Sequence, residues 1–330
     1  MSQKRYEAID GLRTFSCLGI VAMHVLGNGE YPLGGWLFNK FIPSLTNLVF
    51  LFMTISAFGM CCGYFEKCVK RELDVNMFYS KRYLKILPFF AVLCLLDFFM
   101  SPSVSSLYET FANLTLCFGL IPNANISVIG VGWFLGVVFA FYLLFPFFCF
   151  LLNNKKRAWI SFLVAYVMNY LCAHYFKAER TSIVYCFVFF IVGGMVYLYR
   201  DKLLSIKYLT AISGVGLVIF VVLFYLQSSS NVLIMILVNV FTLLCAISLS
   251  GTNILNNKVT RFMGAISFEI YLCHMIVFRI YEKLNLIYLT SNDYINYFVA
   301  IIAVIMGSTL FAYTGKKLIE HVLALLPISL

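Results

Sequence analysis

Three ionisable side chains near the N-terminus, Asp10, Arg13 and His24, are spaced to project from one side of a single helix. At about 100° per residue, the eleven steps from Arg13 to His24 turn a helix just over three times and rise about 16 Å, while Asp10 lies one turn before Arg13. An imidazole titrates close to neutral pH and can therefore accept a proton from a substrate. The spacing predicts a polar stripe with a cation at one end and a general base at the other.

A second polar stripe is predicted in the segment ISFEIYLCHMIVF, where Ser267, Tyr271 and His274 are spaced at i, i+4 and i+7. Counted from the start of its helix, His274 lies as deep as His24. Each stripe also has a structural interpretation. A lone buried histidine usually forms a hydrogen bond between helices, and an arginine at a helix end often only sets the orientation of a membrane span. Two histidines at one depth favour function over packing alone.

Composition places these stripes in a membrane. The 330 residues are 62% apolar and only 12% charged, and apolar runs recur along the whole chain, so no soluble core could absorb them. The net charge of +10 could indicate a nucleic-acid partner, but in a membrane protein excess lysine and arginine usually mark cytoplasmic loops. We therefore expect a polytopic protein surrounded by membrane lipids, with no nucleic acid as a partner.

The apolar runs are long enough to cross a membrane about ten times, because crossing about 30 Å of hydrocarbon takes roughly 20 apolar residues. Such segments lie at 12–28, 43–65, 84–100, 131–152, 158–176, 182–199, 208–226, 231–250, 262–282 and 296–315. The predicted fold class is all-α. We expect a single polytopic bundle of about ten transmembrane helices over residues 1–330, with no appended soluble domain.

Charge predicts the orientation of this bundle. With the N-terminus inside, 19 lysines and arginines fall on the cytoplasmic side and 5 outside, which predicts a plasma-membrane protein with both termini in the cytoplasm. The stretch SLYETFANLTLCFGLIP is partly apolar and could be an eleventh span. If it crossed, the later basic loops would all invert, so we expect residues 101–130 to form an outer loop or a re-entrant, interfacial element.

The sequence lacks the usual signatures of metal sites and of common soluble enzymes. The eleven cysteines lie mostly inside apolar segments, at irregular spacings and without C-x-x-C, so we predict small core hydrophobes rather than disulfides or zinc ligands, and we expect no metal. There is also no Walker loop, G-x-S-x-G or H-E-x-x-H.

Six segments, in order along most of the chain, resemble motifs of the acyltransferase 3 family of integral-membrane acyltransferases. AIDGLRTFSCLGIVAMH is similar to the family's opening D-G-L-R with a histidine eleven residues after the arginine, and LVFLFMTISAFGM resembles F-F-x-x-S-G-F-L. MFYSKRYLKILPFF resembles F-x-x-R-R-x-x-R-I-L-P, and WFLGVVFAFYLLFP resembles W-F-L…Y-L-L-x-P. AISFEIYLCHMIVF resembles I-S-Y-x-x-Y-L-x-H, and TGKKLIEHV resembles the closing segment with a glutamate. Each match is weak alone, but six in this order are specific.

The resemblance implies an enzyme that takes an acyl group, usually acetyl from acetyl-CoA, on the cytoplasmic side. It would deliver that group to a hydroxyl of a cell-surface glycan or lipid-linked sugar at the outer face. The implied catalytic residues are Arg13 and His24, with Asp10 beside Arg13 on the same stripe. The implied donor and substrate contacts are Arg13, Lys81, Arg82 and Lys85 for acetyl-CoA, and Ser56, Trp133, Tyr271 and His274 for substrate. Candidate protein partners are a second copy of the chain and other glycan-assembly proteins.

Several of these positions also have a structural interpretation. The basic residues at 81–85 could simply belong to a positive-inside loop, Ser56 could allow close helix packing, and Trp133 could be an aromatic-belt residue. The chain also departs from the family pattern: Val138 stands where an acidic residue is frequent, and lysines at positions 81 and 85 cannot form the bidentate phosphate contacts of arginine. The acceptor and the geometry of the donor site therefore stay open.

A second class of function also fits the histidines. A secondary transporter or lipid-linked sugar flippase could use them as a proton relay near the middle of the membrane. The absence of a detectable inverted repeat and of Gly/Pro-broken helix pairs counts against a transporter. A family member without activity would fold but show no turnover. Release of free thiol from acetyl-CoA in the presence of acceptor distinguishes an acyltransferase from both alternatives.

Overall fold

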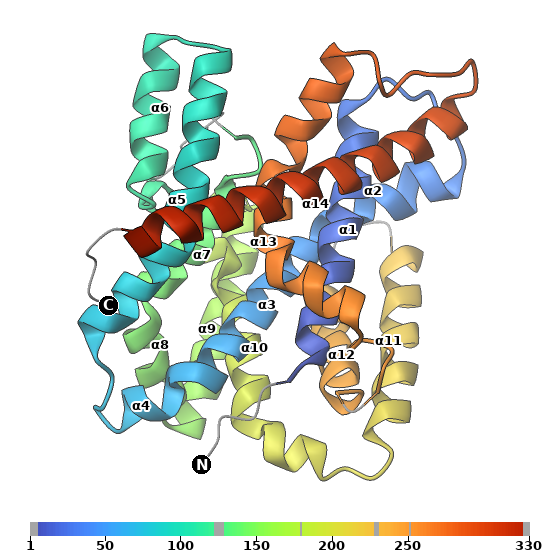
Figure 1. Ribbon diagram of the computed structural model, residues 1–330. Coiled ribbons are helices and arrows are strands. Elements are labelled where there is room, and N and C mark those ends of the chain that lie inside the picture. Colours follow the sequence, from blue (N-terminus) through green and yellow to red (C-terminus); the bar gives the residue numbers. More distant parts are fainter. Residues whose placement is uncertain (1–5, 122–128, 179, 228–230, 251, 326–330) are drawn as a thin grey trace.

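The structure is a computed structural model that describes residues 6–121, 129–178, 180–227, 231–250 and 252–325. Within these ranges every regular element is a helix, and no strand occurs. Several helices are long and apolar enough to cross a membrane. The prediction of an all-α polytopic membrane bundle is therefore confirmed (Figure 1).

The bundle is built from long helices joined by short turns. The first half of the chain contains α1 (Ala8–Asn28), η1 (Leu37–Phe41), α2 (Ile42–Ser44), η2 (Leu45–Asn47), α3 (Leu48–Met60), η3 (Cys61–Phe65), α4 (Glu66–Val69), α5 (Val75–Met100), α6 (Val104–Leu114), η4 (Phe118–Leu120), α7 (Trp133–Leu143) and α8 (Phe145–Leu152). The second half contains α9 (Lys155–His174), α10 (Ile183–Leu204), α11 (Leu209–Leu226), α12 (Val232–Ser248), α13 (Lys258–Lys283) and α14 (Asp293–Leu325).

Each of the ten predicted spans coincides with a helix, but not all ten helices qualify as spans. In the described ranges, seven helical runs are long and apolar enough to cross a membrane: α1, the continuous run Leu37–Val69, α5, α10, α11, α13 and α14. Among the other three predicted spans, α12 is 17 residues long and α9 begins with three basic residues. Length and composition therefore support seven crossings, or eight when α7 and α8 count as one.

The predicted span 131–152 is not one straight helix. It consists of α7 and α8, whose axes differ in direction by 63° across Leu144. The bend falls where Pro146 occupies the first turn of α8. Proline has no backbone N–H and its ring clashes with the carbonyl four residues earlier, so the helix breaks there. The bend brings the carboxyl end of α7, including Tyr142, close to α5.

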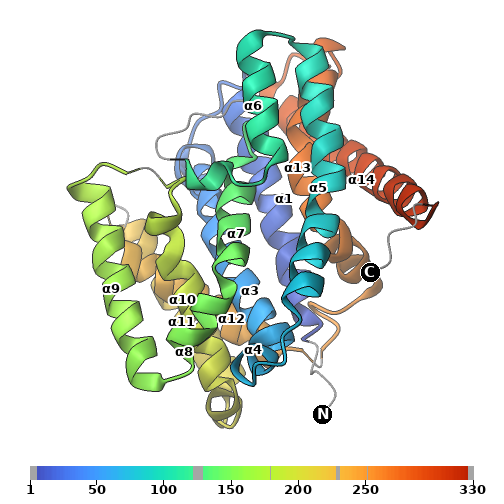
Figure 2. The ribbon, with the colours of Figure 1, turned by 90° about the vertical axis from the view of Figure 1, so that its left-hand side faces the viewer.

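The segment 101–130 forms a helical hairpin with the end of α5 over its described part. α6 runs antiparallel to α5 and protrudes from one end of the bundle (Figures 1 and 2). A capping box between Ser103 and Ser106 begins α6, which has only 11 residues and is too short to cross a membrane. This agrees with the prediction that the segment does not cross. Residues 122–128 of the predicted element lie outside the described residues.

The helices α1, α3 and α13 lie inside the bundle, and α1 and α13 carry the two polar stripes. α1 packs against α13 and α3, and α13 packs also against α14, the long helix that crosses the bundle obliquely in Figure 1. The closest approach involves Gly264 of α13, where a Cβ atom would lie 2.5 Å from the carbonyl oxygen of Asp10. Thr14 strengthens this contact by donating a hydrogen bond to the carbonyl oxygen of Thr260, at 3.1 Å. The register of the two helices is thereby fixed.

The cysteines do not form disulfides. All eleven are free, and seven of them are buried. The described residues also contain no group of three His, Cys, Asp or Glu side chains that could hold a metal ion. The cysteines that are buried behave as small apolar side chains within the helical core.

Candidate functional site

The stripe on α1 begins with an ion pair. The guanidinium Nη1 of Arg13 lies 3.1 Å from Oδ1 of Asp10, one turn earlier on the same helix. Asp10 is buried, whereas 34% of the Arg13 side chain is exposed. The pair orients the arginine and leaves part of the guanidinium accessible to a ligand.

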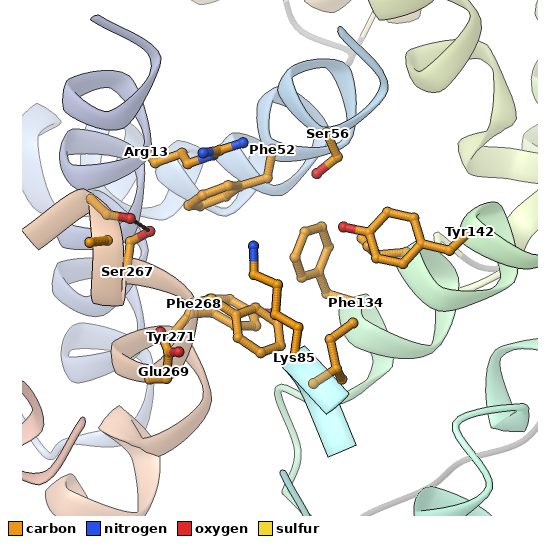
Figure 3. Close-up of a pocket in the computed structure, with 14 residues that line it drawn as sticks. Arg13, Phe52, Ser56, Lys85, Phe134, Tyr142, Ser267, Phe268, Glu269 and Tyr271 are labelled. Atoms are coloured by element: carbon orange, nitrogen blue, oxygen red, sulfur yellow. Dashed lines mark hydrogen bonds between the residues drawn. The ribbon is translucent and has the colours of Figure 1, made fainter. Parts of the chain in front are cut away.

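The Arg13 side chain lines a cavity of about 100 Å³ that is enclosed by α1, α3, α5, α7 and α13 (Figure 3). Its polar lining includes Arg13, Ser56, Lys85, Tyr142, Glu269 and Tyr271. Four of these residues were predicted as site residues from the sequence, and they come from four different helices. The fold therefore assembles one cavity from residues that are up to 258 positions apart in the chain.

The predicted basic patch separates into three different environments. Lys85 extends its ammonium nitrogen into the cavity (Figure 3). Arg82 lies beside the cavity, where it donates a hydrogen bond to the hydroxyl of Tyr64 at 2.8 Å and stacks on aromatic rings. Lys81 is exposed and does not line the cavity. The structure thus places one lysine of the patch where a ligand in the cavity would meet it.

A polar corner of the cavity is formed by Ser56 and Tyr142. Their hydroxyl oxygens face each other across the cavity wall (Figure 3), and the Tyr142 hydroxyl also interacts with Arg82. The ring of Tyr142 lies 5.7 Å from the guanidinium carbon of Arg82. Tyr142 therefore connects the serine of α3 to the basic patch of α5.

An ion pair with a buried carboxylate lies on the opposite wall. Oε1 of Glu269 is 3.0 Å from the ammonium nitrogen of Lys316, which also donates a hydrogen bond to the carbonyl oxygen of Ala265 at 2.8 Å. Glu269 is only 4% exposed, and its Oε2 has no partner among the described residues. A second cavity of about 130 Å³ adjoins this wall and shares Lys85 and Glu269 with the first.

The charges around the two cavities do not cancel. In the part of the chain that the structure describes, four cations face three carboxylates: Arg13, Arg82, Lys85 and Lys316 against Asp10, Glu269 and Glu320. Two of the cations are neutralised by ion pairs, whereas Lys85 forms none within the described ranges. A cavity with an excess of positive charge and low-dielectric walls attracts anionic ligands.

The two predicted histidines lie side by side. The ring centroids of His24 and His274 are 5.2 Å apart, although the residues belong to different helices. Nδ1 of His274 lies 2.6 Å from the carbonyl oxygen of Tyr271, so in the neutral ring Nδ1 carries the proton and Nε2 keeps a lone pair. That Nε2 atom is buried and has no partner among the described residues.

Tyr271 connects the histidines to the cavity. Its side chain lines the cavity, and its ring centroid lies 5.8 Å from that of His274. The Tyr271 hydroxyl donates a hydrogen bond to the carbonyl oxygen of Val131 at 2.9 Å, which holds the ring in place. Neither His24 nor His274 lines the cavity itself. A ligand in the cavity would therefore meet Tyr271 before it reached the histidines.

Trp133 lies next to an arginine from the α9–α10 connection. The guanidinium carbon of Arg180 is 5.3 Å from the Trp133 ring centroid and 5.2 Å from that of Phe50. Its Nη2 donates a hydrogen bond to the carbonyl oxygen of Thr46 at 2.9 Å, and its charge acts on His24. Burial lowers the pKa of Arg180, as expected for a cation with little contact to water.

The sequence interpretation missed four of these residues. Glu269 lies inside the quoted motif AISFEIYLCHMIVF and Tyr142 inside WFLGVVFAFYLLFP, but neither residue was assigned a role. Lys316 and Arg180 entered only as charges at the ends of spans. The available signal was that Glu269 is an acidic residue inside an apolar span, which is expensive unless it is paired or functional.

Fold and site together define a multi-pass membrane protein with a cationic cavity next to a pair of histidines, of which His274 is buried and His24 is partly buried. Residues 6–315 match the model of a family described as an acyltransferase domain, and this match covers nearly the whole chain. The protein belongs to the acyltransferase 3 family, as its motifs predicted, and is a membrane acyltransferase. No curated protein and no solved structure matches the chain.

Proposed function

We propose that the protein transfers an acetyl group from acetyl-CoA to a hydroxyl of a cell-surface or lipid-linked glycan. In this proposal it lies in the plasma membrane with both termini in the cytoplasm. The donor enters from the end of the bundle that carries α4 and the beginnings of α9 and α13, and the acceptor approaches from the opposite end (Figures 1 and 2). The excess of lysine and arginine at the first end supports this orientation.

The cationic cavity supports an anionic donor. Pockets that enclose a whole drug-sized ligand measure about 300–1,000 Å³, so a cavity of about 100 Å³ would hold only one end of acetyl-CoA. Lys85 and Arg13 are accessible to that end, and they can neutralise negative charge on the donor. The remainder of the donor would extend towards the exposed lysine at position 81 and the solvent.

The observation that carries the proposal is the position of the histidine pair directly beyond Tyr271. His24 would remove the proton from the acceptor hydroxyl as its oxygen attacks the thioester carbonyl. The carbon–sulfur bond then breaks, the acyl group stays on the acceptor oxygen, and the proton held by His24 passes to the CoA thiolate. Nε2 of His274 would hold the adjacent imidazole or the substrate hydroxyl by accepting a hydrogen bond.

Membership in an acyltransferase family favours acyl transfer over a transporter that uses the same histidines. The test is the release of free thiol from acetyl-CoA by purified protein in detergent, with and without a glycan acceptor. We expect acceptor-dependent release from the natural protein and a decrease of roughly 10²–10⁴-fold for His24→Ala.

The control variant for this experiment is His174→Ala. His174 is an exposed histidine at the end of α9, where its ring centroid lies 4.5 Å from that of Tyr170. Thiol release should be unchanged in this variant, and both proteins should be produced in equal amounts. Full activity of the His24→Ala protein would exclude His24 as the base. A natural protein that never releases thiol, with any acceptor tried, would argue against the whole proposal.

A further inference from the structure

Arg180 is a cation without an anionic partner. In the described part of the chain it forms no ion pair, and only its Nη2 has an acceptor, the carbonyl oxygen of Thr46. Its Nε is buried and has no acceptor. The arginine at position 279, which lies at the same end of the bundle in the predicted topology, differs in this respect because it pairs with Asp97 at 3.5 Å.

The surroundings of Arg180 are unfavourable for an isolated charge. Its guanidinium lies over the rings of Phe50 and Trp133, and the residue is only partly exposed to water. Removing a cation from water costs several kcal/mol unless a partner compensates, so a cation that is largely removed from water and has no ion pair is a candidate binding residue. Stacking on aromatic rings returns only about 0.5–2 kcal/mol for each contact. Stacking therefore does not offset the whole cost of removing the charge from water, whereas a bound anion would.

The position of Arg180 indicates which of the two substrates would carry this anion. Arg180 lies over the ring of Trp133, and a chain of ring contacts runs from Trp133 through Phe134 to Tyr271 and His274, so a group bound to Arg180 would lie on the side of the site that carries the histidine pair. Arg180 comes from the connection between α9 and α10, away from Arg13 and Lys85, which line the cavity proposed for the donor. In the proposed function, the negative charge of the donor is neutralised by Arg13 and Lys85, so Arg180 is left for the acceptor.

We propose that Arg180 is a binding residue for an anionic group of the acyl acceptor, either a phosphate or a sugar carboxylate, which it holds next to His24. The role as acceptor site rests on the proposed function, whereas the anion site itself does not. A guanidinium presents several N–H donors in a planar fork that matches carboxylate and phosphate oxygens, and Trp133 and Phe50 fix the plane of this fork. The enzyme would then select acidic or phosphorylated acceptors over neutral ones.

The test measures anion binding without any acyl transfer. The midpoint of thermal unfolding of the full chain in detergent is followed against increasing sodium phosphate, and separately against sodium glucuronate, at an ionic strength held constant with sodium chloride. A ligand that binds only the folded protein raises this midpoint in a concentration-dependent way. All proteins also carry Lys85→Gln, so that the cavity proposed for the donor contributes less to phosphate binding.

We expect at least one of the two anions to raise the midpoint, and the one that does so identifies the group as phosphate, carboxylate or both. Arg180→Gln should abolish the rise, whereas the control Arg279→Gln, which removes an arginine that already has a carboxylate partner, should keep it. If Arg180→Gln does not fold, Arg180→Lys is used in its place. Lysine keeps the charge but loses the bidentate contact, so the apparent affinity for the anion should be about tenfold weaker than with arginine.

Three results would overturn the inference: no rise with either anion, a rise that persists in Arg180→Gln, or an unchanged affinity in Arg180→Lys. Failure of the proposed function gives a different pattern. In that case the anion still binds through Arg180, but acetyl-CoA releases no thiol whatever the acceptor.

Discussion

Lys85 offers the sharpest test of the donor site, because it is the cation of the cavity that has no carboxylate partner within the described ranges. Replacement by glutamine removes its charge and keeps most of its length. We expect Lys85→Gln to raise the KM for acetyl-CoA. Because the lysine contributes to binding of the ground state and the transition state alike, kcat should change little.

The size of the effect follows from the position of the ammonium group. A hydrogen bond to a charged partner contributes about 1.5–3 kcal/mol. Lys85 is exposed through the cavities that it lines, so water screens the interaction and the lower value applies. A loss of about 1.5 kcal/mol corresponds to a roughly tenfold weaker interaction with the donor.

The assay is the initial rate of thiol release at increasing concentrations of acetyl-CoA and a fixed concentration of acceptor. The control is Lys81→Gln, which makes the same change in charge four residues earlier on the same helix, but at an exposed position outside the cavity. Its KM should stay within about twofold of that of the natural protein. Identical saturation curves for the Lys85→Gln and natural proteins would refute the reasoning. Equal changes in both variants would mean that general surface charge, rather than the cavity, attracts the donor.

Two further predictions concern stability, each measured as the midpoint of thermal unfolding in detergent. Lys316→Met should lower the midpoint more than Lys317→Met. The first change leaves both carboxylate oxygens of Glu269 without a partner, which costs about 1–3 kcal/mol. Equal midpoints for the two variants would contradict this prediction. Gly264→Ala should destabilise the folded protein by about 1–3 kcal/mol, because the added Cβ would collide with the backbone of α1. The control is Gly214→Ala, whose Cβ meets nothing within 4 Å. An unchanged midpoint for Gly264→Ala would show that the two helices can separate there.

Much of the fold could be predicted because the membrane imposes a simple rule on the sequence. Every backbone polar group must be satisfied inside its own segment, so long apolar runs become helices, and each of the ten predicted segments contains one. The bend between α7 and α8 was missed, although Pro146 provided the signal for it. The residue pattern alone could not show whether neighbouring helices would compensate for the break, because that depends on packing between distant segments.

The site was predictable along each helix but not between helices. The spacing within α1 and α13 correctly put Arg13 and His24 on one helix and Tyr271 and His274 on another. The sequence also put both histidines at one depth, but only the structure shows that their rings are in contact. The pairing of Glu269 with Lys316 depends instead on how α14 crosses α13, which no local pattern specifies. For the same reason Lys81 and Lys85, four residues apart, looked equivalent in sequence and differ in the structure.

The packing of α1 on α13 holds the cavity and the histidine pair, which lie at different depths in the bundle, in one fixed arrangement. α1 carries Arg13 and His24 about 16 Å apart, and α13 carries Glu269 and His274 about 7.5 Å apart, so each helix contributes to both the cavity and the histidine pair. If the two helices slid past each other, the histidine rings would separate and the cavity would change shape at the same time. The close contact at Gly264 resists such sliding, because the two backbones touch there without an intervening side chain. This contact between the two helices therefore keeps the cavity proposed for the donor and the proposed base in a fixed relation, and Tyr271 is the side chain that lies between them.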